Sequence, residues 1–231
     1  MASGQIEPGG MAEKYKPGVN ELRLERGTPG VDAGHPNFED AQRILQSIRE
    51  AAKHVDLMIA YQHNHAYDAN FQTMFREELP ERLVPPKWIK AWAHEEVDAG
   101  AYIVVLHGAP ILQGVEIYRG KPIFYDLGNF IFNLPLRVDW FEPIAFESIV
   151  AHAEFQGKTL KSVTFGPIVL NPTGRGDGAL ALRTRGLPSP AGERSGYILR
   201  RLAEVSRLVG TTVEVNGHKA KVKLNSATTG L

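Results

Sequence analysis

The sequence predicts an α/β fold with a parallel and an antiparallel part. In the first half, amphipathic helical segments alternate with short apolar segments that end in polar residues, a pattern typical of βαβ units. In the second half, longer apolar segments are paired around short turns that contain glycine, which indicates antiparallel strands. Hydrophobic residues make up 43% of the 231 residues and charged residues 23%, so the chain can form a sizeable core.

The first half divides into an irregular segment and four predicted elements. Residues 1–36 are rich in Gly and Pro and lack periodicity, so we expect an irregular N-terminal segment before a domain over 37–231. A helix is expected to follow Asn37 as N-cap, because apolar residues then recur at helical spacing. The predicted elements are a helix over 38–54, a buried strand over 55–61, a helix over 86–98 and a buried strand over 102–106.

The second half is expected to be mainly antiparallel. Residues 171–178 are rich in glycine and are interpreted as a loop that does not join a strand to a helix, which argues against a phosphate-binding loop. One helix is expected, over 195–208, because four aliphatic residues share one face. The predicted hairpins pair 115–118 with 122–126, 145–155 with 160–170, and 211–215 with 220–224 around Asn216-Gly217.

Composition excludes several classes of protein. Lys and Arg number 26 and Asp and Glu also 26, so the balanced charge argues against a dedicated nucleic-acid binder. The chain has no cysteine, so a metal would need His, Asp, Glu, Asn or backbone oxygen as ligands. We expect no membrane span, because no segment approaches about 20 apolar residues. The N-terminal residues lack the pattern of a signal peptide, so the expected location is the cytoplasm.

Three histidines lie where the two predicted parallel strands end. His63 and His65 follow the first strand, and His107 follows the second. Ligands bind at the carboxyl ends of strands in open α/β sheets, and imidazole is the commonest protein metal ligand. A single histidine would more often be a hydrogen-bonded structural residue, but three at adjacent strand ends favour a functional site.

Two further polar residues are candidates for the same site. Glu116 lies inside a predicted strand and is interpreted as a residue that orients a ligand or binds substrate, the alternative being an exposed strand residue. Asn129 follows Gly128 after an apolar strand, where it offers an amide, although Gly and Asn also favour ordinary turns.

The segment that carries these residues resembles a known family. Residues 97–132, VDAGAYIVVLHGAPILQGVEIYRGKPIFYDLGNFIF, are similar to the signature of the CapA-like proteins of poly-γ-glutamate capsule biosynthesis, which resemble metallophosphoesterases. Upstream, VDLMIAYQHNH looks like the family's strand that ends in a metal-binding histidine, which falls on His63. The resemblance implies a metallophosphoesterase-like sandwich of mixed sheets flanked by helices.

The resemblance also implies a dinuclear metal centre, and the expected cofactor is a divalent ion, Mn, Zn or Fe. His63 and His107 would be ligands, and Glu116 and Asn129 would be signature residues near the centre. Two departures from the family pattern reduce the number of metal ligands that this chain can supply. Proline occupies the position of the family's second histidine, at Pro110, and the motifs of the family's first half are absent, so the chain is expected to lack the N-terminal part of the domain.

His65 is our own candidate for a third ligand, on spacing alone. The leading hypothesis is a metal-dependent hydrolase that cleaves a phosphoester or a γ-glutamyl amide in a polymer or small-molecule substrate. The alternatives are a non-catalytic component of polymer or capsule biosynthesis, or a remodelled metal-dependent enzyme acting on a polysaccharide. A second chain or another copy of this chain is the expected partner that would complete the site.

Overall fold

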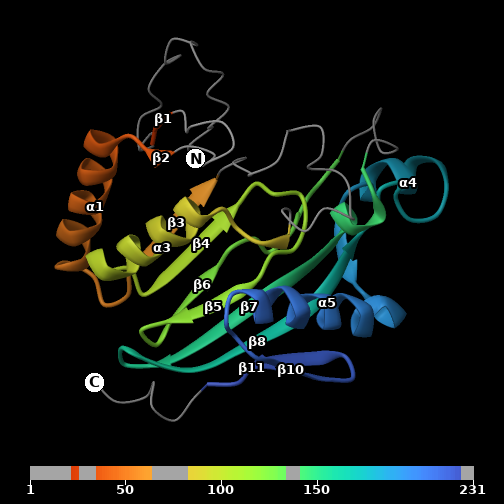
Figure 1. The fold of residues 1–231 in the computed structure, drawn as a ribbon. Coiled ribbons are helices and arrows are strands. Elements are labelled where there is room, and N and C mark those ends of the chain that lie inside the picture. Colours follow the sequence, from red (N-terminus) through yellow and green to blue (C-terminus); the bar gives the residue numbers. More distant parts are fainter. Residues whose placement is uncertain (1–21, 26–34, 64–82, 134–140, 225–231) are drawn as a thin grey trace.

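The computed structural model describes residues 22–25, 35–63, 83–133 and 141–224, which form two sheets flanked by helices (Figure 1). The first sheet has the order β3-β4-β6-β5. In it, β3, β4 and β6 are parallel neighbours, and β5 is antiparallel to β6. Its strands are β3 (Ile59–His63), β4 (Ile103–His107), β5 (Val115–Tyr118) and β6 (Lys121–Phe124).

Two helices, α1 (Phe38–Ala52) and α3 (Lys87–Ala99), pack on one face of this sheet. The Asn37 side chain caps α1 by accepting a hydrogen bond from the Asp40 amide at 3.1 Å, as the sequence predicted. Helix α3 ends at Gly100, whose φ of 126° is strained for other residues. A Cβ there would lie 2.8 Å from the Cβ of Ala52, so glycine also lets the ends of the two helices approach.

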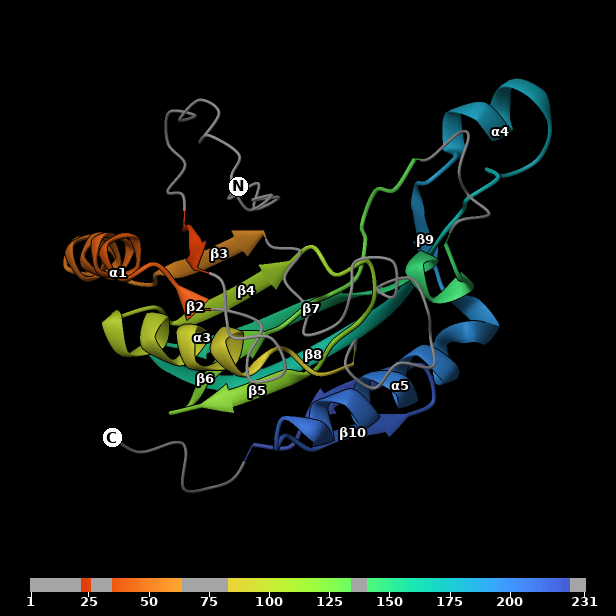
Figure 2. The ribbon, with the colours of Figure 1, turned by 45° about the horizontal axis from the view of Figure 1, so that its top comes forward.

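The second sheet packs against the opposite face of the first sheet (Figure 2). Its order is β10-β11-β8-β7, with β9 paired to β8, and all of these pairings are antiparallel. Helix α5 (Ser195–Leu208), whose bounds the sequence predicted, buries Ile198, Leu199 and Leu202 in the core between the sheets. The strands are β7 (Glu147–Gln156), β8 (Thr159–Leu170), β9 (Pro188–Pro190), β10 (Val213–Asn216) and β11 (Lys219–Val222).

The mixed α/β sandwich predicted from the sequence is therefore confirmed. Shorter elements complete it. Strands β1 (Leu24–Glu25) and β2 (His35–Pro36) pair with each other, so the segment over 1–36 is not irregular throughout. The other short elements are the 3-10 helices η3 (Pro143–Phe146) and η4 (Gly192–Arg194) and the helix α4 (Gly178–Thr184).

Strand β3 differs from its prediction in position and burial. It begins at Ile59 rather than at Val55, because the carbonyl of Met58 accepts the Tyr102 amide at the entry to the sheet, at 2.8 Å. It is also an edge strand, so Ile59 is 55% exposed and Tyr61 53% exposed, whereas a strand buried on both faces was expected.

Two further predictions were wrong in detail. The glycine-rich loop over 171–178 does lead from a strand, β8, to a helix, α4, although the helix has seven residues and buries none of them. In the last hairpin, Asn216 pairs with Lys219, so the turn is Gly217-His218 rather than Asn216-Gly217. Among the residues that the structure describes, no helix has the length and apolar character needed to cross a membrane.

Candidate metal centre

His63 and His107 lie side by side at the carboxyl ends of β3 and β4. The two residues are register partners in the parallel ladder. Their rings are stacked, with centroids 5.7 Å apart and planes at 26°. The structure therefore brings together the two histidines that the sequence placed at neighbouring strand ends. His65 lies outside the described residues, so its place relative to this pair is not given.

The ring of His107 is held in one orientation by a backbone carbonyl. Its Nε2 lies 3.0 Å from the oxygen of Gly128. Because a carbonyl can only accept a hydrogen bond, Nε2 carries the proton, and Nδ1 of the neutral ring then has a free lone pair. Nδ1 is buried and makes no hydrogen bond to any described residue. Burial lowers the pKa of His107, with the bond to Gly128 acting in the opposite direction, which favours the neutral form that binds metal ions.

Asp126 is a third polar residue at this end of the sheet. It follows β6, and because β6 runs parallel to β4, its carboxyl group lies near the loop after His107. Its Oδ1 accepts the amide of Gly128 at 2.7 Å, and Oδ2 makes no hydrogen bond within the described part of the chain. Burial raises the pKa of Asp126 well above its usual value, while the amides of Gly128, Gly108 and Ala109 oppose this change.

Asp126 was not predicted as a site residue, because its strand was expected to form only a hairpin. That hairpin is present, but β6 also pairs with β4 in parallel. The available signal was an acidic residue directly after a third apolar strand, at the position where the other two strands carry histidine.

Glu116 lies away from the histidine pair. Its Oε2 accepts the hydroxyl of Tyr125 at 2.6 Å and lies 3.0 Å from Nε2 of His94, and Lys90 lies 3.4 Å from its Oε1. The ring of His94 stacks on Tyr118 with centroids 3.8 Å apart. Glu116 therefore joins α3 to β5 and β6 on the face of the sheet that the helices cover.

Asn129 is buried, and its side-chain amide donates to the carbonyl of Ala145 at 2.9 Å. This bond ties the loop after β6 to η3. The same loop packs closely on β7, because a Cβ on Gly128 would lie 2.9 Å from the carbonyl oxygen of Glu147. The φ of Gly128 is 78°, so glycine is required there for two reasons.

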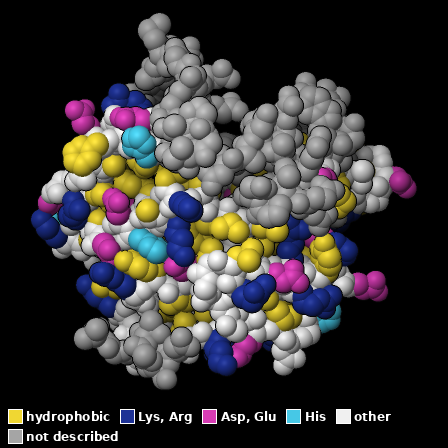
Figure 3. Space-filling model, viewed as in Figure 1, with side chains coloured by type: hydrophobic (Ala, Val, Ile, Leu, Met, Phe, Trp, Pro, Cys, Tyr) yellow, Lys and Arg dark blue, Asp and Glu magenta, His cyan; other side chains and the backbone are white. Residues whose placement is uncertain are grey.

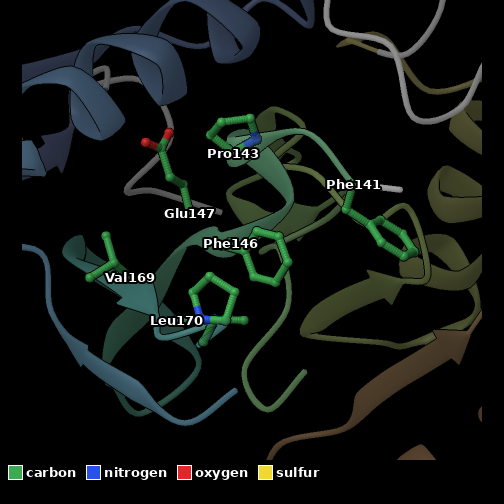
Figure 4. A pocket seen from close by; sticks show the side chains of 7 residues that line it. Phe141, Pro143, Phe146, Glu147, Val169 and Leu170 are labelled. Atoms are coloured by element: carbon green, nitrogen blue, oxygen red, sulfur yellow. The ribbon is translucent and has the colours of Figure 1, made fainter. Parts of the chain in front are cut away.

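An apolar pocket of about 340 Å³ opens beside η3 (Figure 4). The Glu147 carboxylate points away from Phe146 and Leu170 and binds Arg194 through Oε1. Neither histidine of the pair lines this pocket. Its lining residues are Phe141, Pro143, Phe146, Glu147, Val169, Leu170 and Pro172.

The described residues fit part of a metal site. Within them, no group of three His, Asp or Glu side chains is arranged to hold an ion. The free lone pair of His107 and the adjacent ring of His63 would supply at most two ligands, and Pro110, at the position of the family's second histidine, supplies none.

Basic and acidic side chains are interspersed over the face shown in Figure 3.

Comparisons with known proteins agree on one family. The model of the family described as "Bacterial capsule synthesis protein PGA_cap" matches residues 3–134, more than half of the chain. The match includes β3, β4, β5 and β6, and therefore both histidines of the pair.

Several relatives are similar over parts of the chain. The uncharacterized proteins y4sH and y4uA of Sinorhizobium fredii are each 28% identical over 237 residues, which cover 84% of this chain and 48% of theirs. The PGA biosynthesis protein CapA of Bacillus subtilis is 32% identical over 110 residues, 47% of this chain and 24% of its own. The capsule biosynthesis protein CapA of Bacillus anthracis is 48% identical over 61 residues, 26% of this chain and 14% of its own. The chain thus spans about half the length of the first two relatives.

Proposed function

The chain belongs to the bacterial capsule synthesis protein PGA_cap family, and from this premise we propose that it contributes metal ligands to a hydrolase of capsule-polymer biosynthesis. The carrying observation is the buried Nδ1 of His107, which faces no hydrogen-bond partner among the described residues. A buried nitrogen lone pair without a partner is costly unless a ligand occupies it, and a divalent cation is the ligand that neutral imidazole prefers.

Each residue of the site has a separate task in this proposal. His63 and His107 bind one ion, and the Gly128 carbonyl fixes the ring of His107 by accepting its Nε2 proton. A bound divalent ion such as Mn²⁺, Zn²⁺ or Fe²⁺ would activate water and polarise the bond that is cleaved. The remaining ligands come from His65, from a second chain or from another copy of this chain. The bond is a phosphoester or a γ-glutamyl amide, in a polymer or a small molecule.

A non-catalytic role in capsule biosynthesis is the second candidate. Two observations favour it: Pro110 replaces a histidine of the family pattern, and the described residues contain no group of three metal-binding side chains. In that case the histidine pair would be a remnant, and the chain would act by binding a polymer or a protein partner.

Metal content distinguishes the two candidates. Protein purified without chelator would be analysed by elemental mass spectrometry, together with His63→Ala, His107→Ala and His65→Ala. His152→Ala is the matched control, because His152 is exposed on β7 and far from the pair in sequence. About one ion per chain, lost in the first two variants and kept in the control, supports the hydrolase. Loss in His65→Ala identifies the third ligand, and wild-type protein without an ion favours the non-catalytic role.

A further inference from the structure

The carboxyl group of Asp126 lies between the two loops that define the position of His107. It accepts the Gly128 amide from the loop after β6, and it interacts with the amides of Gly108 and Ala109 in the loop after β4. The side chain is 1% exposed, so water does not compete for these donors. The carboxyl group thus binds the Gly128 amide and lies close to two amides of the other loop.

Both loops are also held by other contacts. The Ser148 hydroxyl donates to the carbonyl of Leu127 at 2.6 Å, and the Ile149 amide donates to the same carbonyl at 3.1 Å, so β7 holds the loop after β6. The loop after β4 begins at His107, and its far end is tied to the loop after β6 by the Gln113 amide, which donates to the Asp126 carbonyl at 3.1 Å. The Asp126 carboxyl group adds an interaction at the end of this loop that lies next to His107. Asp126 also binds the amide of Gly128, the residue whose carbonyl accepts the His107 proton, so its carboxyl group acts next to both partners of that bond.

We propose that Asp126 is a positioning residue that keeps the ring of His107 turned with Nε2 towards the Gly128 carbonyl and Nδ1 free for a ligand. The significance of this orientation for metal binding rests on the proposed function, but the orientation itself does not. Without the carboxyl group, the buried Gly128 amide loses its acceptor, and the Gly128 carbonyl can move relative to the ring of His107. The ring then exchanges between its two neutral tautomers, and the lone pair at Nδ1 is present for only part of the time.

The test uses the full chain and reads the tautomer directly. The ring nitrogens of His107 would be observed by long-range nitrogen–proton NMR in metal-free, isotope-labelled protein, with His107→Gln to assign the signals. Wild-type protein is expected to show a proton on Nε2 alone. Asp126→Ala is expected to show averaged signals from both nitrogens. Asp126→Asn keeps an oxygen that can accept the Gly128 amide and places its NH₂ group at the position of Oδ2, which makes no hydrogen bond to a described residue, so it should keep the proton on Nε2.

Glu96→Gln is the matched control, because Glu96 is another buried carboxyl group with a free oxygen, on α3. It should leave the His107 signals unchanged. A fixed Nε2 proton in folded Asp126→Ala would overturn the proposal. If that variant does not fold, the spectrum of Asp126→Leu, which has a similar shape and no acceptor, decides in the same way.

Zinc binding gives a second, separate readout. Calorimetry with Zn²⁺ alone should show an affinity about 10-fold or more weaker in Asp126→Ala than in wild type, the usual effect of losing a group that orients a ligand. Wild-type protein that binds no Zn²⁺ would contradict the proposed function, whereas the tautomer comparison would still test Asp126. An unchanged Zn²⁺ affinity together with averaged tautomers would overturn the link between the two.

Discussion

Replacing Glu96 by Gln should remove a large part of the pH dependence of folding stability. Glu96 lies on the buried side of α3, is 4% exposed, and has one carboxyl oxygen with no hydrogen bond to the described residues. Burial raises its pKa from 4.5 to about 8, and a hydrogen bond from Trp92 reduces this effect. The carboxyl group is therefore protonated in the folded protein at neutral pH and ionised in the unfolded chain.

The sign and size follow from proton binding. Between pH 4.5 and about 8 the folded state binds the proton and the unfolded state releases it, so the free energy of unfolding falls as the pH rises. The stabilisation that comes from proton binding by folded Glu96 is fully present below pH 4.5 and is lost as the pH passes through about 8. Each pH unit in this window corresponds to about 1.4 kcal/mol, so the ceiling is roughly 5 kcal/mol.

Urea unfolding followed by tryptophan fluorescence, at several values from about pH 5 to about pH 9, measures this change. Near pH 5 the stability of Glu96→Gln should match that of wild type within about 1 kcal/mol, because both side chains are then neutral. Near pH 9 the variant should be the more stable protein by several kcal/mol. Glu95→Gln removes an exposed carboxylate from the same helix and should leave the slope unchanged. Equal slopes for wild type and Glu96→Gln would refute the reasoning.

Three further predictions concern the residues around the histidine pair. Glu116→Gln and Tyr125→Phe should each lower the free energy of unfolding by about 1–3 kcal/mol in urea titrations. The double variant should lower it by less than the sum of the two single effects, because the two side chains share one hydrogen bond. Additive effects would argue against a joint network. Asn129→Ala should cost about 1–3 kcal/mol, since it leaves a buried carbonyl without its donor, and an unchanged midpoint would contradict this structural role. Gly128→Ala should lower the free energy of unfolding by more than 2 kcal/mol, because backbone strain of about 1 kcal/mol is added to a steric clash. Gly217→Ala should lower it by only about 1 kcal/mol, because Gly217 has a similar φ but open space around it. Equal losses for the two glycine variants would show that close packing at Gly128 is not important.

The sequence predicted elements well where one local signal determines them. Helix α5 was predicted with its bounds because aliphatic residues recur on one face, and α1 because Asn37 caps it. The strand β3 was predicted too early because Val55 and Leu57 are apolar, but they lie in the exposed connection from α1. Apolar composition does not show where a strand enters a sheet, since that depends on the partner strand.

The candidate site was predicted in the same uneven way. Adjacent strand ends brought His63 and His107 together, because parallel strands in register present their carboxyl ends at one edge. The role of Asp126 depends on which strand lies beside β4. Nothing local in the sequence distinguishes a hairpin strand that stops at its partner from one that also joins a parallel sheet.

The positions of Tyr125 and Asp126 explain why residues close together in the family signature belong to two separate clusters. Consecutive residues of an extended segment point to opposite faces of a sheet. Tyr125 packs in the core under α1 and α3, where it binds Glu116. Asp126 is on the other face, where it interacts with the loop after His107. The sheet itself therefore separates Glu116 from the histidine pair, and an effect of Glu116 on metal binding would have to act through the position of the strands rather than through contact with the ion.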